Sequence, residues 1–334
     1  MRTLRTAIIG CGGIANYHAK LLSSLERIEI VALCDLLTER AEDFNERYAD
    51  GRAEIFTEYR VMFQEMDLDL VYICLPPFAH SDEVQLAAER GVHIFIEKPI
   101  ALDLGLAREM TQAVEASGVK SQVGFMFRFG QAIEYLKGAL ADGSAGAPGL
   151  MVARYFCNSL HAPWWRVREK SGGQVMEQII HIFDLARYLL GRPETVYSRQ
   201  ANLFHREVEG YTAEDVSGTV VSFENGALAV VGGTNCAIPG QWIGDYRVVT
   251  ERITADFTDA NHATFYHTTA DPVWTTTISS ERELRLAETL DLIRAIDTNG
   301  QTRTPIREGA ETLALVLAAS ESAEKRAEVE VPEI

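Results

Sequence analysis

The turn GCGGIA at residues 10–15 constrains the fold more than any other stretch, because it follows a strand-like run and opens a helical pattern. In a βαβ unit, such a GxGxxG/A turn reverses sharply, brings the backbone close to a diphosphate and lets helix and strand pack closely. The N-terminus of the helix then attracts the anion. The turn therefore predicts a dinucleotide-binding site formed by Gly10, Gly12, Gly13, Ile14 and Ala15.

The second strand-like run, IEIVALCD, ends in Asp35, twenty residues past Ala15. A carboxylate at this distance from the glycine turn accepts a hydrogen bond from the adenosine ribose 2′-hydroxyl and repels a 2′-phosphate. NAD is therefore favoured over NADP, although the nearby Arg40 leaves NADP open.

Short apolar runs alternate with helical patterns from residue 3 to about residue 122. This pattern predicts a parallel, doubly wound α/β sheet with helices on both faces. The expected strands are residues 6–9, 29–34, 70–75, 92–96 and 119–123.

The chain changes character beyond residue 123, where a helix-rich insert is followed by β-rich sequence. A hairpin signal at Asn225-Gly226 lies between two strand-like runs. We expect a Rossmann domain over residues 1–122 and an α+β domain over residues 123–334, built on a mostly antiparallel sheet and used for substrate binding and oligomerisation.

Charge and cysteine content limit the partners and the compartment. With 48 acidic and 31 basic residues the formal charge is -17, which disfavours binding to nucleic acid and to anionic membranes. Five cysteines without a CxxC pattern fit reduced thiols in a cytosol. The N-terminal residues resemble neither a signal peptide nor a membrane span. We therefore expect a cytoplasmic protein that acts on a small molecule.

Two further strand ends carry candidate site residues. The run CLPPFAH brings Pro76 and His80 to the carboxyl edge of the sheet, where doubly wound folds bind ligands; a rigid loop with a solvated or helix-capping histidine explains it equally well. The next strand ends in Glu97-Lys98-Pro99, and the proline restricts Lys98 to extended backbone angles. Lys98 then faces the cofactor, unless Glu97 and Lys98 form only a surface pair.

A polar stripe marks the apolar helical run GGQVMEQIIHIFDLARYLL at residues 172–190. At about 100° of rotation per residue, Glu177, His181 and Asp184 fall within roughly 60° of one another. Ionisable groups on a helix that is otherwise buried face either a satisfied polar network or a cavity that holds a ligand.

The glycine turn, the EKP tripeptide at residues 97–99 and the GG…H-x-x-D helix together resemble the glucose-fructose oxidoreductase / inositol dehydrogenase (Gfo/Idh/MocA) family, from residue 5 to roughly residue 320. The resemblance implies a nicotinamide-dependent oxidoreductase acting on the CH-OH group of a sugar, a cyclic polyol or a related hydroxy compound. It implies that Lys98 and His181 act near the reacting carbon. The family's usual aspartate four residues before the histidine is Glu177 here.

The expected catalytic residues are Lys98, His181 and Glu177. His181 takes the hydroxyl proton while hydride leaves the carbon, Glu177 stabilises the imidazolium, and Lys98 binds the same oxygen. The alternative is a Glu-His-Asp network that only fixes helix packing. Two other readings keep the cofactor: an NAD-binding sensor or regulator without turnover, and a sugar-modifying enzyme that recycles bound NAD.

Three further residues are candidates for substrate binding: Arg128, Trp165 and Asp184. For the first two the reason is that guanidinium and aromatic groups suit polyols and acidic sugars. Packing between domains is the alternative for Arg128 and Trp165. Glu177 and His181 have the i,i+4 spacing of metal ligands, but no second histidine shares their stripe, so we expect no metal. The β-rich second domain favours a homodimer or homotetramer.

Overall fold

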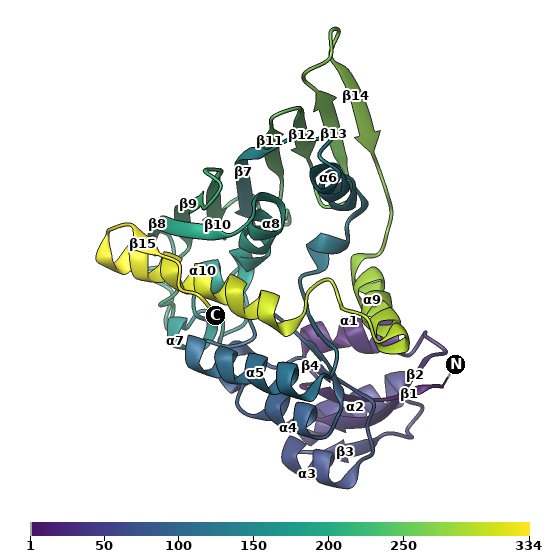
Figure 1. Ribbon diagram of the computed structural model, residues 1–334. Coiled ribbons are helices and arrows are strands. Elements are labelled where there is room, and N and C mark those ends of the chain that lie inside the picture. The colour runs from purple at the N-terminus through teal and green to yellow at the C-terminus, as the bar shows by residue number, and fades with distance from the viewer. Residues whose placement is uncertain (1) are drawn as a thin grey trace. The chain divides into compact units, whose positions relative to one another are not determined.

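The computed structural model describes residues 2–334, which form two compact units (Figure 1). The first unit comprises the described residues up to Gly124 together with Glu288–Ala310, and the second comprises Phe125–Ala287 and Glu311–Ile334. The division therefore differs from a single boundary at residue 122, because a late segment returns to the first unit. Among residues 2–334, no helix is both long and apolar enough to cross a bilayer.

The first unit contains the predicted doubly wound parallel sheet, with strand order β3-β2-β1-β4-β5-β6 among the described residues. Its strands are β1 (Leu4–Ile9), β2 (Ile28–Cys34), β3 (Glu54–Phe56), β4 (Leu70–Ile73), β5 (His93–Ile96) and β6 (Ser121–Val123). Five of these were expected from the sequence. The edge strand β3 was missed because three residues are too few for a periodic pattern to register.

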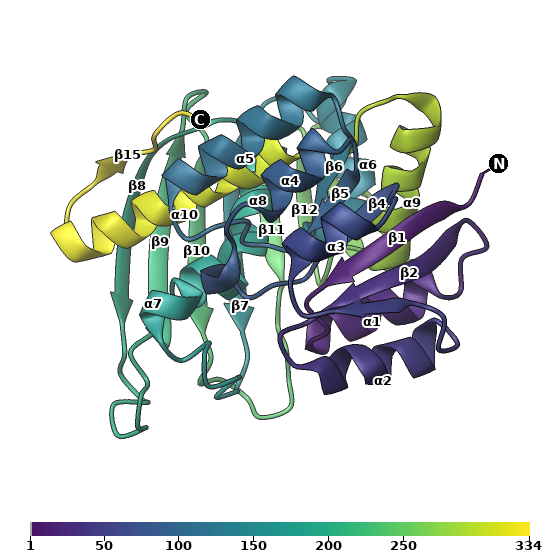
Figure 2. The same cartoon turned by 90° about the horizontal axis from the view of Figure 1, so that it is seen from below.

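Helices cover both faces of this sheet (Figure 2). They are α1 (Gly13–Leu22), α2 (Thr38–Tyr48), α3 (Tyr59–Glu65), α4 (Glu83–Glu89) and α5 (Leu104–Ser117). On the face of α1 and α2, the core also contains Leu292 and Ile293 of helix α9 (Leu284–Thr298). Burial of these two side chains explains why residues 288–310 belong to the first unit.

The strand order reverses beside β1, which pairs with β2 on one side and β4 on the other. Ligands of doubly wound folds bind at the carboxyl ends of the strands next to such a reversal. Gly10 follows β1 there, and Cys74 follows β4.

The second unit is built on a mostly antiparallel sheet, with order β14-β13-β12-β11-β7-β10-β9-β8-β15 in the described part of the chain. The strands are β7 (Pro148–Phe156), β8 (Pro193–Ala201), β9 (Val216–Phe223), β10 (Leu228–Thr234), β11 (Tyr246–Thr250), β12 (Ile253–Phe257), β13 (Ala263–His267), β14 (Trp274–Ile278) and β15 (Val329–Glu330). Strands β7 and β10 run parallel. The predicted hairpin is present, because β9 pairs antiparallel with β10 and Gly226 has φ +85°.

Helices of the second unit lie on one face of this sheet (Figure 1). They are α6 (Gln131–Ala141), α8 (Ile180–Leu190) and the part of α10 (Ile306–Lys325) that follows Ala310. Helix α8 carries His181 and packs against β7 and β10. The short helix α7 (Arg168–Ser171) precedes the glycine pair Gly172-Gly173.

The apolar run at 172–190 was predicted to form one uninterrupted α-helix, and this prediction is wrong. Its first turn, η3 (Val175–Ile179), is a π-helix that continues into α8. A π-turn rotates less than 100° per residue, so the angular estimate for Glu177 and His181 does not hold. Apolar periodicity does not reveal such a turn, because five residues are too few to distinguish one helical period from another. The expected burial is confirmed for the apolar side, formed by Val175, Ile179, Ile182, Ala186 and Leu189.

A buried carboxylate fixes the start of η3. Glu214 Oε1 accepts a hydrogen bond of 2.8 Å from the backbone N–H of Val175. Gly173 has φ +95°, and a Cβ built there would lie 2.2 Å from Glu214 Oε2. Burial raises the pKa of Glu214, while the nearby Arg168 guanidinium partly offsets that rise. The second glycine of the pair is therefore required by its backbone conformation and by the carboxylate beside it.

We predict that Gly173→Ala lowers the free energy of unfolding by about 2–4 kcal/mol, because it adds left-handed strain and displaces a buried cap. Gly240→Ala is the matched control, since Gly240 has φ +75° but an added Cβ meets nothing within 4 Å. That variant loses only about 1 kcal/mol. Denaturant unfolding measures both, and equal losses would contradict the assigned role of Glu214.

Candidate active site

The glycine turn leaves open space in front of helix α1. Gly10 has φ +88°, and a Cβ built there would lie 2.7 Å from the carbonyl oxygen of Cys74, so this position requires glycine. At Gly12 and Gly13 an added Cβ meets nothing within 4 Å. Gly12 is the N-cap, and no side chain caps the helix. Unfilled space at an uncapped helix N-terminus fits the diphosphate of a dinucleotide.

Asp35 is held beside this turn. Its Oδ2 accepts a hydrogen bond of 2.8 Å from the backbone N–H of Cys11, and its Oδ1 accepts one of 2.9 Å from the N–H of Leu37. A carboxylate oxygen can accept two hydrogen bonds, so each Asp35 oxygen retains capacity for a ribose hydroxyl. Burial, followed by the charge of Asp35, raises the pKa of Cys11 to about 12, so its sulfur is a thiol.

The loop after β4 positions Pro76 and His80. Pro76 precedes the short helix η1 (Pro77–Ala79), and the side chain of His80 is buried rather than solvated. His80 Nδ1 lies 2.6 Å from Glu83 Oε1, while Glu83 Oε2 accepts the backbone N–H of Ser81. The other ring nitrogen, Nε2, is buried and has no hydrogen-bond partner among the described residues. A buried imidazole nitrogen without a hydrogen-bond partner is able to bind a ligand. A role for Pro76 and His80 in cofactor binding stays a prediction.

Glu97 is buried, so it does not belong to a surface Glu-Lys pair. Its Oε1 lies 2.8 Å from His18 Nε2, and its Oε2 accepts the backbone N–H of Lys98 at 3.2 Å. A Cβ at Gly124 would lie 2.8 Å from Glu97 Oε2, so the glycine leaves room for the carboxylate. Glu97 thereby fixes the backbone at Lys98.

His18 is a buried residue of this site that no sequence motif predicts. It lies on α1 with its ring centroid 5.3 Å from Tyr72 and 4.7 Å from Phe95. The available signal is its place in the apolar stripe of α1, three residues after Ala15 and directly before Ala19, both of which are buried. A histidine on a buried stripe requires a polar partner, but the sequence does not say which.

His181 and Glu177 are placed by aromatic side chains of the second unit. The buried His181 ring contacts Phe127, with centroids 5.0 Å apart, and approaches Phe125 edge-on at 6.3 Å. Glu177 Oε2 accepts a hydrogen bond of 2.6 Å from the indole N–H of Trp165. Trp165 is 3% exposed, so its aromatic face is largely covered. The structure thus joins an expected catalytic residue to an expected substrate-binding residue.

Arg128 and Asp184 form a buried, bidentate ion pair. Arg128 donates from Nε to Asp184 Oδ2 at 2.8 Å and from Nη2 to Oδ1 at 2.6 Å, with side chains 2% and 1% exposed. The Tyr188 ring lies 4.5 Å from Arg128 Cζ, and Thr312 donates to Asp184. Because the two charges neutralise each other, this geometry fits packing within the second unit. Their role in substrate binding stays a prediction.

The expected residues thus form two local groups. Residues 10–15, Asp35 and Lys98 belong to the first unit, whereas Glu177, His181 and Trp165 belong to the second. Within the first unit, backbone N–H groups position Asp35 and Glu97. Within the second, aromatic rings and Glu214 position the helix.

We predict that His18→Leu lowers the free energy of unfolding by about 1–3 kcal/mol, because it leaves the buried Glu97 carboxylate without that partner. His18→Gln retains an N–H donor, so its free energy of unfolding falls by less. Denaturant unfolding measures the free energy of unfolding of both variants. A similar decrease in the two would show that the hydrogen bond to Glu97 contributes little to stability.

Comparison with known proteins identifies both units. Residues 4–125 match a family described as "Oxidoreductase family, NAD-binding Rossmann fold", and residues 133–258 match the "GFO/IDH/MocA C-terminal domain". The NAD-binding match agrees with the open helix N-terminus and with Asp35.

Alignments with curated relatives span about two thirds of this chain and about two thirds of each relative. The chain is 33% identical over 235 residues to scyllo-inositol 2-dehydrogenase (NAD(+)) from Bacillus subtilis (strain 168), covering 68% of this chain and 66% of the relative. It is 32% identical over 238 residues to the oxidoreductase YrbE of the same organism, covering 70% and 68%. Among solved structures, levoglucosan dehydrogenase in complex with NADH and L-sorbose superimposes with a TM-score of 0.91 over 100% of both chains at 20% identity, which shows the shared fold.

Proposed function

Because the chain belongs to the GFO/IDH/MocA family of NAD-binding oxidoreductases, we propose that it transfers hydride between NAD and a secondary alcohol of a sugar, a cyclic polyol or a related hydroxy compound. The observation that carries the proposal is the glycine turn, which leaves the N-terminus of α1 open beside the fixed carboxylate of Asp35. The relative named scyllo-inositol 2-dehydrogenase supports a polyol as substrate.

Bound NAD supplies the hydride acceptor. The hydroxyl proton has to leave at the same time, and the imidazole of His181 takes it up. The aromatic contacts of His181 support this role, because they orient the ring and lower the local polarity around it. Glu177 stabilises the imidazolium formed, and its hydrogen bond with Trp165 holds the carboxylate in place.

Lys98 assists by binding the oxygen that loses its proton and stabilising the developing alkoxide charge. This role of Lys98 is supported by Glu97, whose carboxylate accepts a hydrogen bond from the backbone N–H of Lys98 and is itself hydrogen-bonded to His18. A lysine on a fixed backbone loses less conformational freedom when it binds an oxyanion. In the direction of reduction, His181 returns the proton to the same oxygen.

We predict that His181→Asn lowers turnover by about 10²-fold or more while NAD affinity is retained, because general acid-base catalysis is lost and the cofactor turn is untouched. The assay follows reduced-nicotinamide absorbance after purified protein is mixed with NAD and a small-molecule cell extract. His262→Asn is the matched control, since His262 is a partly exposed histidine of the same unit, paired with Asp259.

Wild-type turnover in His181→Asn would remove His181 from the mechanism. If the wild type binds NAD but reduces none of it, a sensor without turnover or an enzyme that recycles bound NAD replaces the dehydrogenase proposal. Release of a modified sugar without net NADH then distinguishes the recycling enzyme from the sensor.

We infer that the chain forms a homodimer or homotetramer through the open face of the nine-stranded sheet. The register aligns one row across four neighbouring strands, in which Tyr197, Val220, Val230 and Val152 are 39% to 47% exposed. Contiguous exposed apolar surface of this kind marks an interface. A second copy of the chain presents the same row, so two copies can pair through it. The chain has a formal charge of -17, but the side chains of this row are uncharged, so pairing through them brings no like charges of the row together.

We predict that Val230→Lys lowers the oligomer mass in solution, because it places a charge at the centre of this row. Val273→Lys is the control, since Val273 is exposed outside the row. Light scattering measures both masses. A monomeric wild type, or equal masses for wild type and Val230→Lys, would contradict this interface.

We also infer a cytoplasmic location. All five cysteines are free thiols, and four of them are buried. Unpaired cysteines fit a reducing compartment better than an oxidising one.

A further inference from the structure

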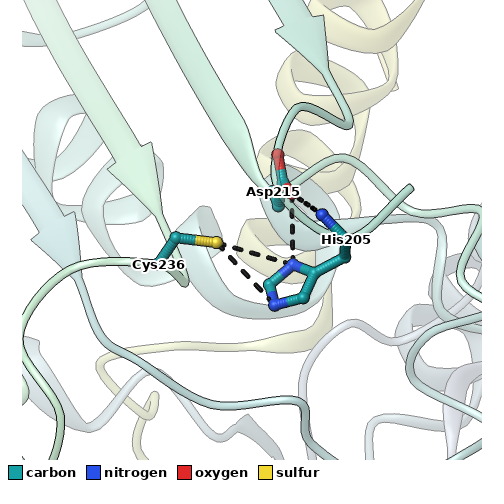
Figure 3. A group of neighbouring side chains, drawn as sticks. All are labelled: His205, Asp215 and Cys236. Carbon is teal, nitrogen blue, oxygen red and sulfur yellow. Dashed lines mark hydrogen bonds and ion pairs between the residues drawn. The ribbon is translucent and has the colours of Figure 1, made fainter. Parts of the chain in front are cut away.

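Three potential metal ligands meet at one end of the second unit's sheet, and none of them takes part in the proposed reaction (Figure 3). His205 follows β8, Asp215 directly precedes β9, and Cys236 follows β10. These three strands are neighbours in the sheet, so residues distant in sequence are brought together. One ligand atom from each residue lies within 4.8 Å of the others.

Asp215 is a rigid, buried carboxylate. Its Oδ1 accepts the backbone N–H of Leu203 at 2.7 Å, and its Oδ2 accepts those of Phe204 at 2.8 Å and His205 at 2.9 Å. These bonds hold the loop that carries His205 against the carboxylate. The geometry is therefore set before any ligand arrives.

The imidazole of His205 is oriented from two sides. Its Nδ1 lies 3.1 Å from Asp215 Oδ2, and its ring stacks on Tyr211 with centroids 4.6 Å apart and planes inclined by 20°. A proton on Nδ1 that is donated to Asp215 leaves Nε2 with its lone pair, which is the form that a metal binds. Carboxylates oriented in this way behind a histidine are common at zinc sites.

The thiol of Cys236 is the second potential metal ligand. Its Sγ lies 3.5 Å from His205 Nδ1 and 3.8 Å from His205 Nε2, and the residue is partly exposed to solvent. For tetrahedral zinc, with bonds of about 2.3 Å to sulfur and about 2.0 Å to nitrogen, the two ligand atoms stand about 3.5 Å apart. Because Sγ now lies nearer to Nδ1, the Cys236 side chain has to rotate toward Nε2 to bring both ligand atoms onto one ion.

We propose that Cys236 Sγ and His205 Nε2 bind a thiophilic divalent cation such as Zn²⁺, with Asp215 orienting the imidazole through Nδ1 and water completing the coordination. The bond from sulfur to metal forms as the thiol proton passes to solvent. A nucleophilic Cys-His-Asp triad is the competing reading of these residues. Burial, followed by the charge of Asp215, raises the pKa of Cys236 to about 11, so the metal-free sulfur is not a reactive thiolate.

A second cysteine provides a matched comparison within the same unit. Cys157 Sγ also lies 3.8 Å from a histidine nitrogen, Nε2 of His161. That nitrogen lies 3.0 Å from Gln178 Nε2, whose amide donates to it and uses the lone pair that a metal requires. Cys157 therefore serves as a control that resembles Cys236 in its histidine neighbour but differs in the availability of that nitrogen.

The test titrates the full chain, after treatment with a chelator, with Zn²⁺ in competition with a chromophoric chelator. We expect one Zn²⁺ per chain in the wild type and in Cys157→Ser. Cys236→Ser and His205→Gln each weaken binding by at least about 100-fold, because loss of a residue that only orients a ligand already costs about 10-fold to 100-fold. Circular dichroism without metal shows whether the variants fold.

Cobalt gives a second measurement that does not depend on the variants or on turnover. Co²⁺ bound through a thiolate produces a sulfur-to-metal charge-transfer band in the near ultraviolet, which we expect in the wild type. Absence of saturable Zn²⁺ binding, absence of this band, or loss of binding in Cys157→Ser would each overturn the proposal. Failure of NAD reduction bears on the oxidoreductase proposal and leaves this one unaffected.

Discussion

The hydrogen bond from the backbone N–H of Val175 to Glu214 determines where the helix bearing Glu177 and His181 begins. A carboxylate loses hydration when it is buried, and the raised pKa of Glu214 records that loss. The helix N-terminus offsets part of it by supplying N–H groups that would otherwise lack an acceptor. Gly173 makes the approach possible, so a glycine, a carboxylate and a helix end together set the position of the predicted acid-base residue.

The same arrangement recurs wherever a candidate site is built. Asp35 accepts N–H groups of its own loop and of the glycine turn, and Asp215 accepts three from the loop that carries His205. Glu97 accepts the N–H of Lys98. In each case an acidic side chain organises a connection between elements, and loops organised in this way hold functional groups in place without losing that order when a ligand arrives.

Structural features that depend on residues close together in the sequence were predictable. The glycine turn, the spacing to Asp35 and the Asn225-Gly226 hairpin each depend on residues within one βαβ unit or one turn. Pairings over long range were not, because periodicity reports that a face is buried and does not identify its partner. The ion pair of Arg128 with Asp184 joins residues 56 positions apart, and His18 reaches Glu97 across 79. The π-turn at η3 was missed for a related reason, since its residues are as apolar as those of an α-helix.

The return of residues 288–310 to the first unit means that the nucleotide-binding module is discontinuous in the gene. Its last strand, β6, is bound by this segment, because the N–H of Val123 donates to the carbonyl of Thr304 at 2.8 Å. The larger segment of the second unit, Phe125–Ala287, is thus inserted between the two segments of the first, while Glu311–Ile334 follows them. A chimaera that grafts only the N-terminal 122 residues onto another protein would leave the edge of β6 unpaired and the core beneath α1 uncovered, so both segments have to be transplanted together.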